Sequence, residues 1–357
     1  MKIATVVGAR PQFIKAASVS RVLRRDHQEI LIHTGQHYDT NMSDIFFDEL
    51  HIPRPDFHLG IGSGRHGAQT GAILEKVEEV LIQETPDALL VYGDTNSTLA
   101  GALAASKLHI PVIHIEAGLR SFNRRMPEEI NRILTDHLSG RLSCPTETAV
   151  KNLIAEGITE GVSQDGDVMY DAFLYNLELA KEKSTILQML GLGPKSYILC
   201  TIHRAENTDD PARLTQILKA LSKISLPVVL PLHPRTRKIV HELGLTSLLN
   251  RLKVIEPVGY LDMITLEANT LKLVTDSGGV QKEAYFAGVP CITMRDETEW
   301  VETVDVGWNR LTGADEEKIL EAVEMFTPPE NHPSIFGDGK AAEQIVATFG
   351  KKNSNQY

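Results

Sequence analysis

The most constraining feature of this sequence is a regular alternation of short apolar runs with longer segments of helical period. The runs in the first third of the chain are "KIATVV", "EILIHTG", "ALLVYGD" and "PVIHIEAG". Those in the second half are "YILCTIH", "PVVLPLH", "LKVIEP", "LKLVTDSGG" and "PCITMRD". Amphipathic segments such as "TGAILEKVEEVLIQ" separate them. Near-continuous apolar strands between helices are typical of parallel sheets covered on both faces, so the sequence predicts an α/β protein.

The alternation pauses once, at "GDVMYDAFLYNLELAKEKSTILQMLGLGPKS", where a polar helix and a Gly/Pro turn predict the joint between two α/β domains. The length of 357 residues also favours two domains. We therefore expect one domain over residues 1–168 and a second over residues 169–339. The segment "FGDGKAAEQIVATF" predicts a closing helix.

Composition limits the classes of partner. The net charge of −11, without a dense Lys/Arg block, argues against nucleic acid or an anionic membrane as a partner, although a local pocket can still be basic. No run approaches the ~20 apolar residues that span a bilayer, and "MKIATVV" is too short for a signal peptide. The three cysteines are widely spaced, and neither they nor the histidines show metal-ligand spacing. We expect a soluble, cytoplasmic protein without a metal.

Polar residues follow most of the predicted strands, where ligands bind in open α/β sheets. These residues are Arg10, Gln36, Asp94, Glu116, His203, His233 and Asp276. Loops are polar in any protein, but Asp94 and Glu116 each close a strongly apolar run directly. Neighbouring parallel strands lie about 4.8 Å apart, so the two carboxylates can face one small ligand and move a proton on it. The alternative for Asp94 is a cap on the following helix.

A second group of acidic residues occurs in "RRMPEEINR", residues 124–132. Pro127 suits a first helical turn, and Glu128 and Glu129 favour the positive end of a helix dipole. Arg132 follows Glu128 by one helical turn, so an intrahelical ion pair is available. A solvated helix start is one interpretation. The other interpretation is that the first turn of this helix reaches the candidate site at the end of the predicted strand that precedes Glu116.

The most specific local pattern is "TDSGGVQKEAYFAG". Ser277 can cap the helix that follows, and Gly278 and Gly279 let a ligand approach the backbone. Free N–H groups and the helix dipole there make an anion site suited to phosphate, and Glu283 can accept hydrogen bonds from ribose hydroxyls. A plain Gly-rich turn with a cap is the alternative.

Other strand exits carry weaker signals. In "VVGARPQFIK", Arg10 and Lys15 are candidate phosphate partners. His203 and His233 end two strands of the second domain, and each is either a structural histidine or part of the site. "GSGRHG" matches G-x-G-x-x-G but does not follow a buried strand, so it gives no support for NAD binding.

Seven segments together resemble one family, the non-hydrolysing UDP-N-acetylglucosamine 2-epimerases. They are "GARPQFIK", "GDTNSTLAGALAA", "HIEAGLRS", "MPEEINR", "HRAEN", "HPRT" and "DSGGVQKEA", and the resemblance covers essentially the whole chain. It implies the GT-B architecture: two facing Rossmann-like domains with parallel sheets and an interdomain cleft. It also implies that residues 340–357 return to the N-terminal domain, that the C-terminal domain binds UDP, and that the protein is a homodimer.

The resemblance implies interconversion of UDP-GlcNAc and UDP-ManNAc without any cofactor. The family eliminates UDP in the anti sense to give 2-acetamidoglucal and then adds it back. By resemblance, the catalytic residues are Asp94, Glu116, Glu128 and His203. The residues that hold the UDP-sugar are Arg10, Lys15, Arg132, His233, Ser277, Gly278, Gly279 and Glu283. On this reading Glu128 works in the cleft, while Glu129 only favours the helix dipole.

Two departures from the family pattern bear on regulation and substrate. Many members are activated by a second UDP-GlcNAc through an arginine where this chain has Ala205, and through a pattern that "GQHYDTNMS" matches only in part, so we expect activation to be weak or absent. Trp300 and Val301 replace an Arg-Pro pair, which resembles the branch acting on UDP-2,3-diacetamido-2,3-dideoxyglucuronate. A GT-B glycosyltransferase is the alternative from another class.

Overall fold

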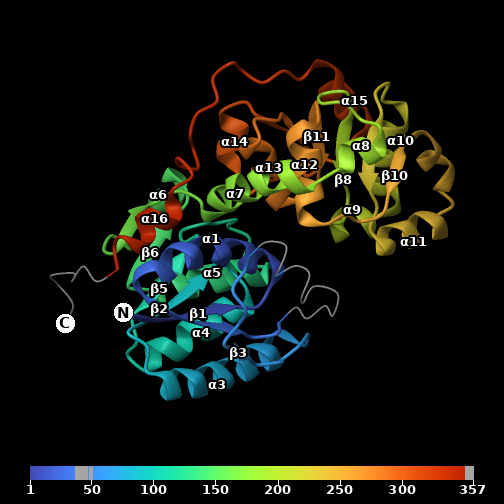
Figure 1. Ribbon diagram of the computed structural model, residues 1–357. Helices are drawn as coiled ribbons and strands as arrows, with labels where there is room; N and C mark the ends of the chain where they lie inside the picture. The colour runs from blue at the N-terminus through green and yellow to red at the C-terminus, as the bar shows by residue number, and fades with distance from the viewer. Residues whose placement is uncertain (37–46, 48–50, 350–357) are drawn as a thin grey trace. The chain divides into compact units, whose positions relative to one another are not determined.

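The computed structural model describes residues 1–36, 47 and 51–349. The chain forms two compact units: Met1–Ala172 with Ser334–Tyr357 is unit 1, and Phe173–Pro333 is unit 2. Each unit contains its own parallel β-sheet (Figure 1). The predicted pair of parallel α/β sheets is therefore confirmed. The sequence-based boundaries differ from these limits by a few residues and stay a prediction, as does the facing arrangement of the domains.

Unit 1 is built on a seven-stranded parallel sheet of order β3-β2-β1-β4-β5-β6-β7. The strands are β1 (Lys2–Val7), β2 (Gln28–His33), β3 (Phe57–His58), β4 (Ala88–Tyr92), β5 (Val112–Ile115), β6 (Arg141–Cys144) and β7 (Val162–Gln164). The helices are α1 (Arg10–Asp26), α3 (His66–Glu84), α4 (Asn96–Lys107), α5 (Pro127–Leu138), α6 (Glu147–Ala155), α7 (Val168–Lys183) and α16 (Ala341–Val346). The four apolar runs predicted as strands form β1, β2, β4 and β5, which lie in the centre of the sheet.

Unit 2 is built on a six-stranded parallel sheet of order β10-β9-β8-β11-β12-β13. The strands are β8 (Ile198–Thr201), β9 (Val228–Pro231), β10 (Lys253–Ile255), β11 (Lys272–Thr275), β12 (Cys291–Thr293) and β13 (Asn309–Leu311). The helices are α8 (Ile186–Leu190), α9 (Ala205–Thr208), α10 (Pro211–Lys223), α11 (Pro234–Glu242), the 3₁₀ helix η2 (Thr246–Arg251), α12 (Tyr260–Asn269), α13 (Gly278–Phe286), α14 (Val301–Asp305) and α15 (Glu316–Met325).

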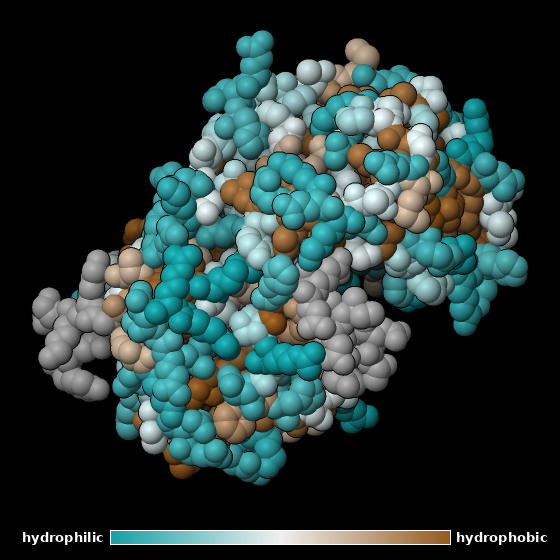
Figure 2. Space-filling view, in the orientation of Figure 1, coloured by the Kyte–Doolittle hydropathy of each residue, from teal (hydrophilic) through white to brown (hydrophobic). Residues whose placement is uncertain are grey.

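Alternating strand residues bury both faces of each sheet. Ile198 and Cys200 of β8 pack in one core cluster with Ile217 of α10, whereas Leu199 packs in another with Ala284 of α13. This burial on both faces explains why the sequences of the central strands are continuous apolar runs. Hydrophilic residues predominate on the face drawn in Figure 2, with apolar residues in smaller groups between them. Among the described residues, none of the helices is both long enough and apolar enough to cross a membrane.

The joint between the units lies in the helix of the segment where the sequence places it, before the Gly/Pro turn. The chain passes from unit 1 to unit 2 inside α7, between Ala172 and Phe173. It returns at Ser334, and α16 then packs on α1 within unit 1. The Asp171 carboxylate accepts hydrogen bonds from the backbone N–H groups of the first two residues of α16, at 3.1 and 2.8 Å. These bonds fix the end of the described chain to unit 1.

The strand orders locate one candidate site in each unit. In an open α/β sheet, ligands bind outside the carboxyl ends of the strands at the point where the strand order reverses. In unit 1 this point lies between β1 and β4, and in unit 2 it lies between β8 and β11. The segments that leave these four strands carry most of the polar residues singled out in the sequence.

Candidate functional site

Asp94 and Glu116 follow adjacent parallel strands of unit 1, because β4 pairs with β5. The backbone is left-handed at Gly93 (φ +61°) and at Glu116 (φ +68°). A left-handed conformation is unusual for a residue with a side chain and costs free energy, so its presence at Glu116 points to a functional constraint. A Cβ atom on Gly93 would lie 3.2 Å from the Glu116 carboxylate, which shows how closely the two strand exits approach.

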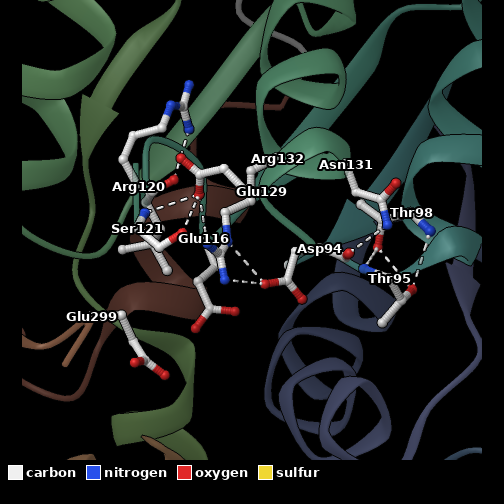
Figure 3. Close-up of polar contacts among 12 residues, drawn as sticks. Asp94, Thr95, Thr98, Glu116, Arg120, Ser121, Glu129, Asn131, Arg132 and Glu299 are labelled. Carbon is white, nitrogen blue, oxygen red and sulfur yellow. Dashed lines mark hydrogen bonds and ion pairs between the residues drawn. The ribbon is translucent and has the colours of Figure 1, made fainter. Parts of the chain in front are cut away.

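Arg132 of α5 holds the Asp94 carboxylate (Figure 3). The guanidinium donates from Nε and Nη2 to Asp94 Oδ2, at 2.9 and 2.7 Å. Desolvation nevertheless raises the pKa of Asp94; Arg132 and Lys15 oppose this rise, and the charge of Glu116 adds to it. A carboxyl group with a raised pKa beside a second carboxylate is suited to holding and releasing a proton.

Of the two glutamates at the start of α5, Glu129 has contacts that the sequence did not predict. Glu129 is 1% exposed and accepts hydrogen bonds from the backbone N–H groups of Ser121 and Phe122 and from Arg132. Although burial opposes it, these bonds lower the pKa of Glu129. The expectation that Glu129 only favours the helix dipole is wrong, because its carboxylate fixes the loop before α5. Arg132 likewise pairs with Glu129 rather than with Glu128, whose side chain is exposed.

Helix α1, which follows β1, contributes a cation to the site that contains Asp94 and Glu116. Lys15 of α1 forms an ion pair with the Glu116 carboxylate, and both side chains are largely buried. Arg10, the first residue of α1, is exposed. The structure therefore brings together Lys15, Arg132, Asp94 and Glu116. They form a compact group of two cations and two carboxylates at the point where the strand order reverses.

Gln12 completes this site, and sequence reasoning missed it. Its side-chain carbonyl accepts from the backbone N–H groups of Gly8 and Ala9, and its amide donates to the carbonyl of Tyr92 at 2.7 Å. The amide also reaches the hydroxyl of Thr95, which caps α4. Gln12 thus joins the start of α1 to the loop that carries Asp94. The cap on α4 comes from Thr95, so the alternative of Asp94 as a helix cap is not realised.

In unit 2, Asp276 joins the exits of β8 and β11. It is fully buried, and its carboxylate accepts from the backbone N–H groups of His203 and Arg204 and from the side chain of Asn207. Burial alone would raise the pKa of Asp276, but the bonds from His203 and Asn207 lower it. His203 Nδ1 lies 3.3 Å from Asp276, and its side chain is 56% exposed. Asp276 thus holds the orientation of the His203 ring, while much of the His203 side chain stays accessible to solvent.

The start of α13 carries the helix cap that the sequence predicted. Ser277 caps the helix and accepts from the backbone N–H of Val280, as predicted. Glu283, one turn further on, is buried and accepts from the hydroxyl of Tyr260 at 2.9 Å. A Cβ atom on Gly278 would lie 2.3 Å from the Glu299 carboxylate, so no other residue fits there without a shift.

Glu299 is a further acidic residue at this helix start that the sequence did not single out. Arg295 donates to its carboxylate at 2.8 Å, and Arg204 lies 3.6 Å away. Burial opposes ionisation, but both arginines help to lower the pKa of Glu299. His233, in contrast, caps α11 through Nδ1, which accepts from the Arg235 N–H. The structure therefore gives His233 a structural contact.

The chain is similar to known proteins over most of its length. The sequence profile described as "UDP-N-acetylglucosamine 2-epimerase" matches residues 21–350. A "UDP-N-acetylglucosamine 2-epimerase homolog" of Methanococcus maripaludis is 57% identical over 97% of this chain and 98% of its own length. The UDP-2,3-diacetamido-2,3-dideoxy-D-glucuronate 2-epimerase of Pseudomonas aeruginosa is 52% identical over 98% of this chain and 100% of its own length.

A solved structure matches as well. The UDP-GlcNAc 2-epimerase of Methanocaldococcus jannaschii, in complex with UDP-GlcNAc and UDP, has a TM-score of 0.87 and 47% identity, covering 97% of this chain and 99% of its own. The resemblance found in the sequence motifs is thereby confirmed over nearly the whole chain. This protein belongs to the UDP-N-acetylglucosamine 2-epimerase family.

Proposed function

We propose that this protein is a non-hydrolysing 2-epimerase that interconverts UDP-GlcNAc and UDP-ManNAc. The observation that carries the proposal is the pairing of Asp94 with Glu116 at adjacent strand exits, with the pKa of Asp94 raised. Two carboxyl groups with different environments can divide the roles of proton donor and acceptor at one carbon. The 47% identity to an epimerase solved with UDP-GlcNAc and UDP supports this substrate.

The reaction follows from the chemistry of the sugar. Carbon 2 has no neighbouring carbonyl, so a carbanion there would lack stabilisation. In the proposed first step, a carboxylate takes the proton from carbon 2, the C–H electron pair forms the C1–C2 double bond, and UDP leaves with the electrons of the C1–O bond. In the second step, UDP oxygen adds back to carbon 1, and carbon 2 receives a proton on the face opposite to the one that lost its proton in the first step. Which carboxyl group serves in which direction is left open.

The start of α13 is the proposed holder of the diphosphate. Ser277, Gly278 and Gly279 offer hydroxyl and backbone N–H donors at the positive end of the helix dipole, which stabilise the negative charge of departing UDP. Glu283 is suited to ribose hydroxyls because carboxylates accept two hydrogen bonds. The further proposed contacts are those of Arg10, Glu128, His203 and His233. No cofactor enters the proposed steps.

A second substrate is favoured by a specific observation. The relative that acts on UDP-2,3-diacetamido-2,3-dideoxy-D-glucuronate is 52% identical, more than the 47% of the epimerase solved with UDP-GlcNAc. Trp300 and Val301, which depart from the family pattern, follow Glu299 at the proposed diphosphate site. The same elimination and re-addition would apply to that sugar, which carries an additional acetamido group and a carboxylate.

Proton NMR in deuterium oxide tests the proposal with each UDP-sugar in turn and no acceptor. Epimerisation predicts a new anomeric signal and deuterium at carbon 2 of the product. Turnover of the diacetamido sugar alone would assign the second substrate. Free sugar with UDP would instead indicate a hydrolysing enzyme. No change with either sugar until an acceptor is added would favour a glycosyltransferase.

Two expectations about the whole protein are part of the proposal. We propose that it forms a homodimer, which light scattering after gel filtration tests, and that it acts in the cytoplasm. A monomer at the enzyme concentrations used in assays would contradict the first.

A further inference from the structure

One buried histidine contacts the strand exit that carries Asp94 and has no place yet in the proposed reaction. His114 belongs to β5, two residues before Glu116, and its side chain is 0% exposed. Its Nδ1 lies 2.7 Å from Oδ1 of Asp136, on α5. Its Nε2 lies 2.7 Å from the carbonyl oxygen of Gly93, the residue before Asp94. The ring therefore bridges α5 and the loop that carries Asp94.

Both partners of the His114 ring accept hydrogen bonds. A carbonyl oxygen has no proton, so Nε2 must donate to Gly93. Asp136 also accepts from Arg120 and from the backbone N–H of Gly118, as an ionised carboxylate does, and an ionised carboxylate can only accept from Nδ1. This pattern of acceptors suits a ring with a proton on each nitrogen, which is an imidazolium ion.

The charges around the ring match this state. Asp136 Oδ2 also accepts from Arg120 Nη1 at 2.7 Å and from the backbone N–H of Gly118 at 3.2 Å. Arg120 in turn makes a two-bond ion pair with Glu156, at 2.7 and 2.8 Å. Arg120 is thus shared between the buried Asp136 and the more exposed Glu156, and a cation on the His114 ring adds to the compensation of the buried carboxylate.

The other ionisable groups near this network are also accounted for. Cys144 of β6 is a neutral thiol, because burial and the charge of Asp136 raise its pKa. Glu116 is paired with Lys15, and Asp94 is held by Arg132. Neither of these cations compensates Asp136, so the imidazolium and Arg120 carry that role.

We propose that His114 is a positioning residue that keeps both ring protons during catalysis and fixes the Gly93 carbonyl, thereby setting the separation of Asp94 and Glu116. Both strand exits need such support, since Gly93 and Glu116 are left-handed. Loss of either ring proton would remove the donor from the ring to the buried Gly93 carbonyl or to Oδ1 of Asp136. The inference rests on the proposed function only for its kinetic test.

NMR of ¹⁵N-histidine-labelled enzyme tests the protonation state directly. At neutral pH, both ring nitrogens of His114 should resonate as protonated. His33 is a reference in the same spectrum: burial and His58 lower its pKa to about 4, so its ring should be neutral. The variants H114Q and H33Q assign the two signals by their loss. An unprotonated nitrogen in the His114 ring would overturn the proposal.

The positioning role is tested by comparing H114Q with H33Q, a matched change at a buried histidine of β2, which lies in the same sheet but is separated from β5 by β1 and β4. The two N–H donors of a glutamine amide share one nitrogen, so they cannot reproduce the positions of the two ring donors, and kcat of H114Q should fall by about 10²-fold while UDP affinity stays near that of the wild type. The amide signals of Gly93 and Asp94 should also move in H114Q but not in H33Q.

Unchanged kcat together with unmoved amide signals in folded H114Q would overturn the positioning role. If the wild type epimerises neither UDP-sugar, the proposed function fails, whereas the ring and amide signals still decide the role of His114. A poorly folded H114Q leaves the decision to the spectrum of the wild-type ring.

Discussion

At the scale of single residues, Asp94 and Glu116 carry the proposed chemistry. The amide variants D94N and E116Q keep the shape of each side chain but remove its ability to take a proton. We expect each to lose at least ~100-fold in the initial rate of epimerisation, measured by NMR. E147Q is a matched control, because Glu147 is a solvent-exposed glutamate of α6. A variant within a few-fold of wild type would remove that residue from the mechanism.

His33 predicts a specific acid sensitivity of the fold. Burial and the nearby His58 lower its pKa from 6.5 to about 4. The unfolded chain therefore protonates His33 below about pH 6.5, whereas the folded protein protonates it only below about pH 4. The contribution of His33 to stability is therefore complete above pH 6.5 and is lost as the pH falls toward 4. At pH 5 the loss is about 2 kcal/mol.

Thermal melting at pH 7 and pH 5 measures this effect. H33Q should lose less stability than the wild type between the two pH values. H241Q, at an exposed histidine of α11, should behave like the wild type. Equal acid sensitivity in H33Q and the wild type would contradict the assignment.

The local sequence pattern could not distinguish the roles of the two glutamates at the start of α5. Glu128 and Glu129 are adjacent and equally suited to a helix start, and consecutive helical residues point in directions about 100° apart. The loop N–H groups of Ser121 and Phe122 select Glu129, and these donors are brought to it only by the folded chain. His114 was detectable in principle, as a lone polar residue in an apolar strand.

At the scale of elements, the start of α13 should act as both a helix cap and an anion site. S277A removes the cap and one donor to the proposed diphosphate. We expect about 1 kcal/mol lower stability and UDP binding weaker by about 10-fold. D315A is the matched control, because Asp315 caps α15 in the same unit.

Calorimetry with UDP separates the two effects. D315A should melt earlier, like S277A, but bind UDP as tightly as the wild type. Equal UDP affinity in all three proteins would show that Ser277 is a cap without a role in binding.

The strands that were not predicted are all at or near sheet edges. β3, β6, β7 and β13 have two to four residues each, and most contain charged or polar side chains. An edge strand is covered on fewer sides, so it lacks the continuous apolar run that identified the central strands. The core of each sheet was therefore predictable from sequence, whereas of the border strands only β10 was predicted, from "LKVIEP".

At the scale of the whole molecule, the proposed enzyme should respond simply to its substrate. Ala205 begins α9 where many relatives use an arginine to bind a second UDP-GlcNAc, and most of "GQHYDTNMS" lies outside the described residues. We expect initial rates to rise hyperbolically with substrate concentration. A sigmoidal curve, or a reverse reaction that requires added UDP-GlcNAc, would contradict this prediction.

The course of the chain between the units has a consequence for its synthesis. Unit 2 is one continuous stretch, whereas unit 1 is made of two segments with unit 2 between them. Domains tend to fold as they emerge from the ribosome. All of unit 2 is thus translated before the backbone donors of α16 reach Asp171, so the half of the protein that begins first is completed last.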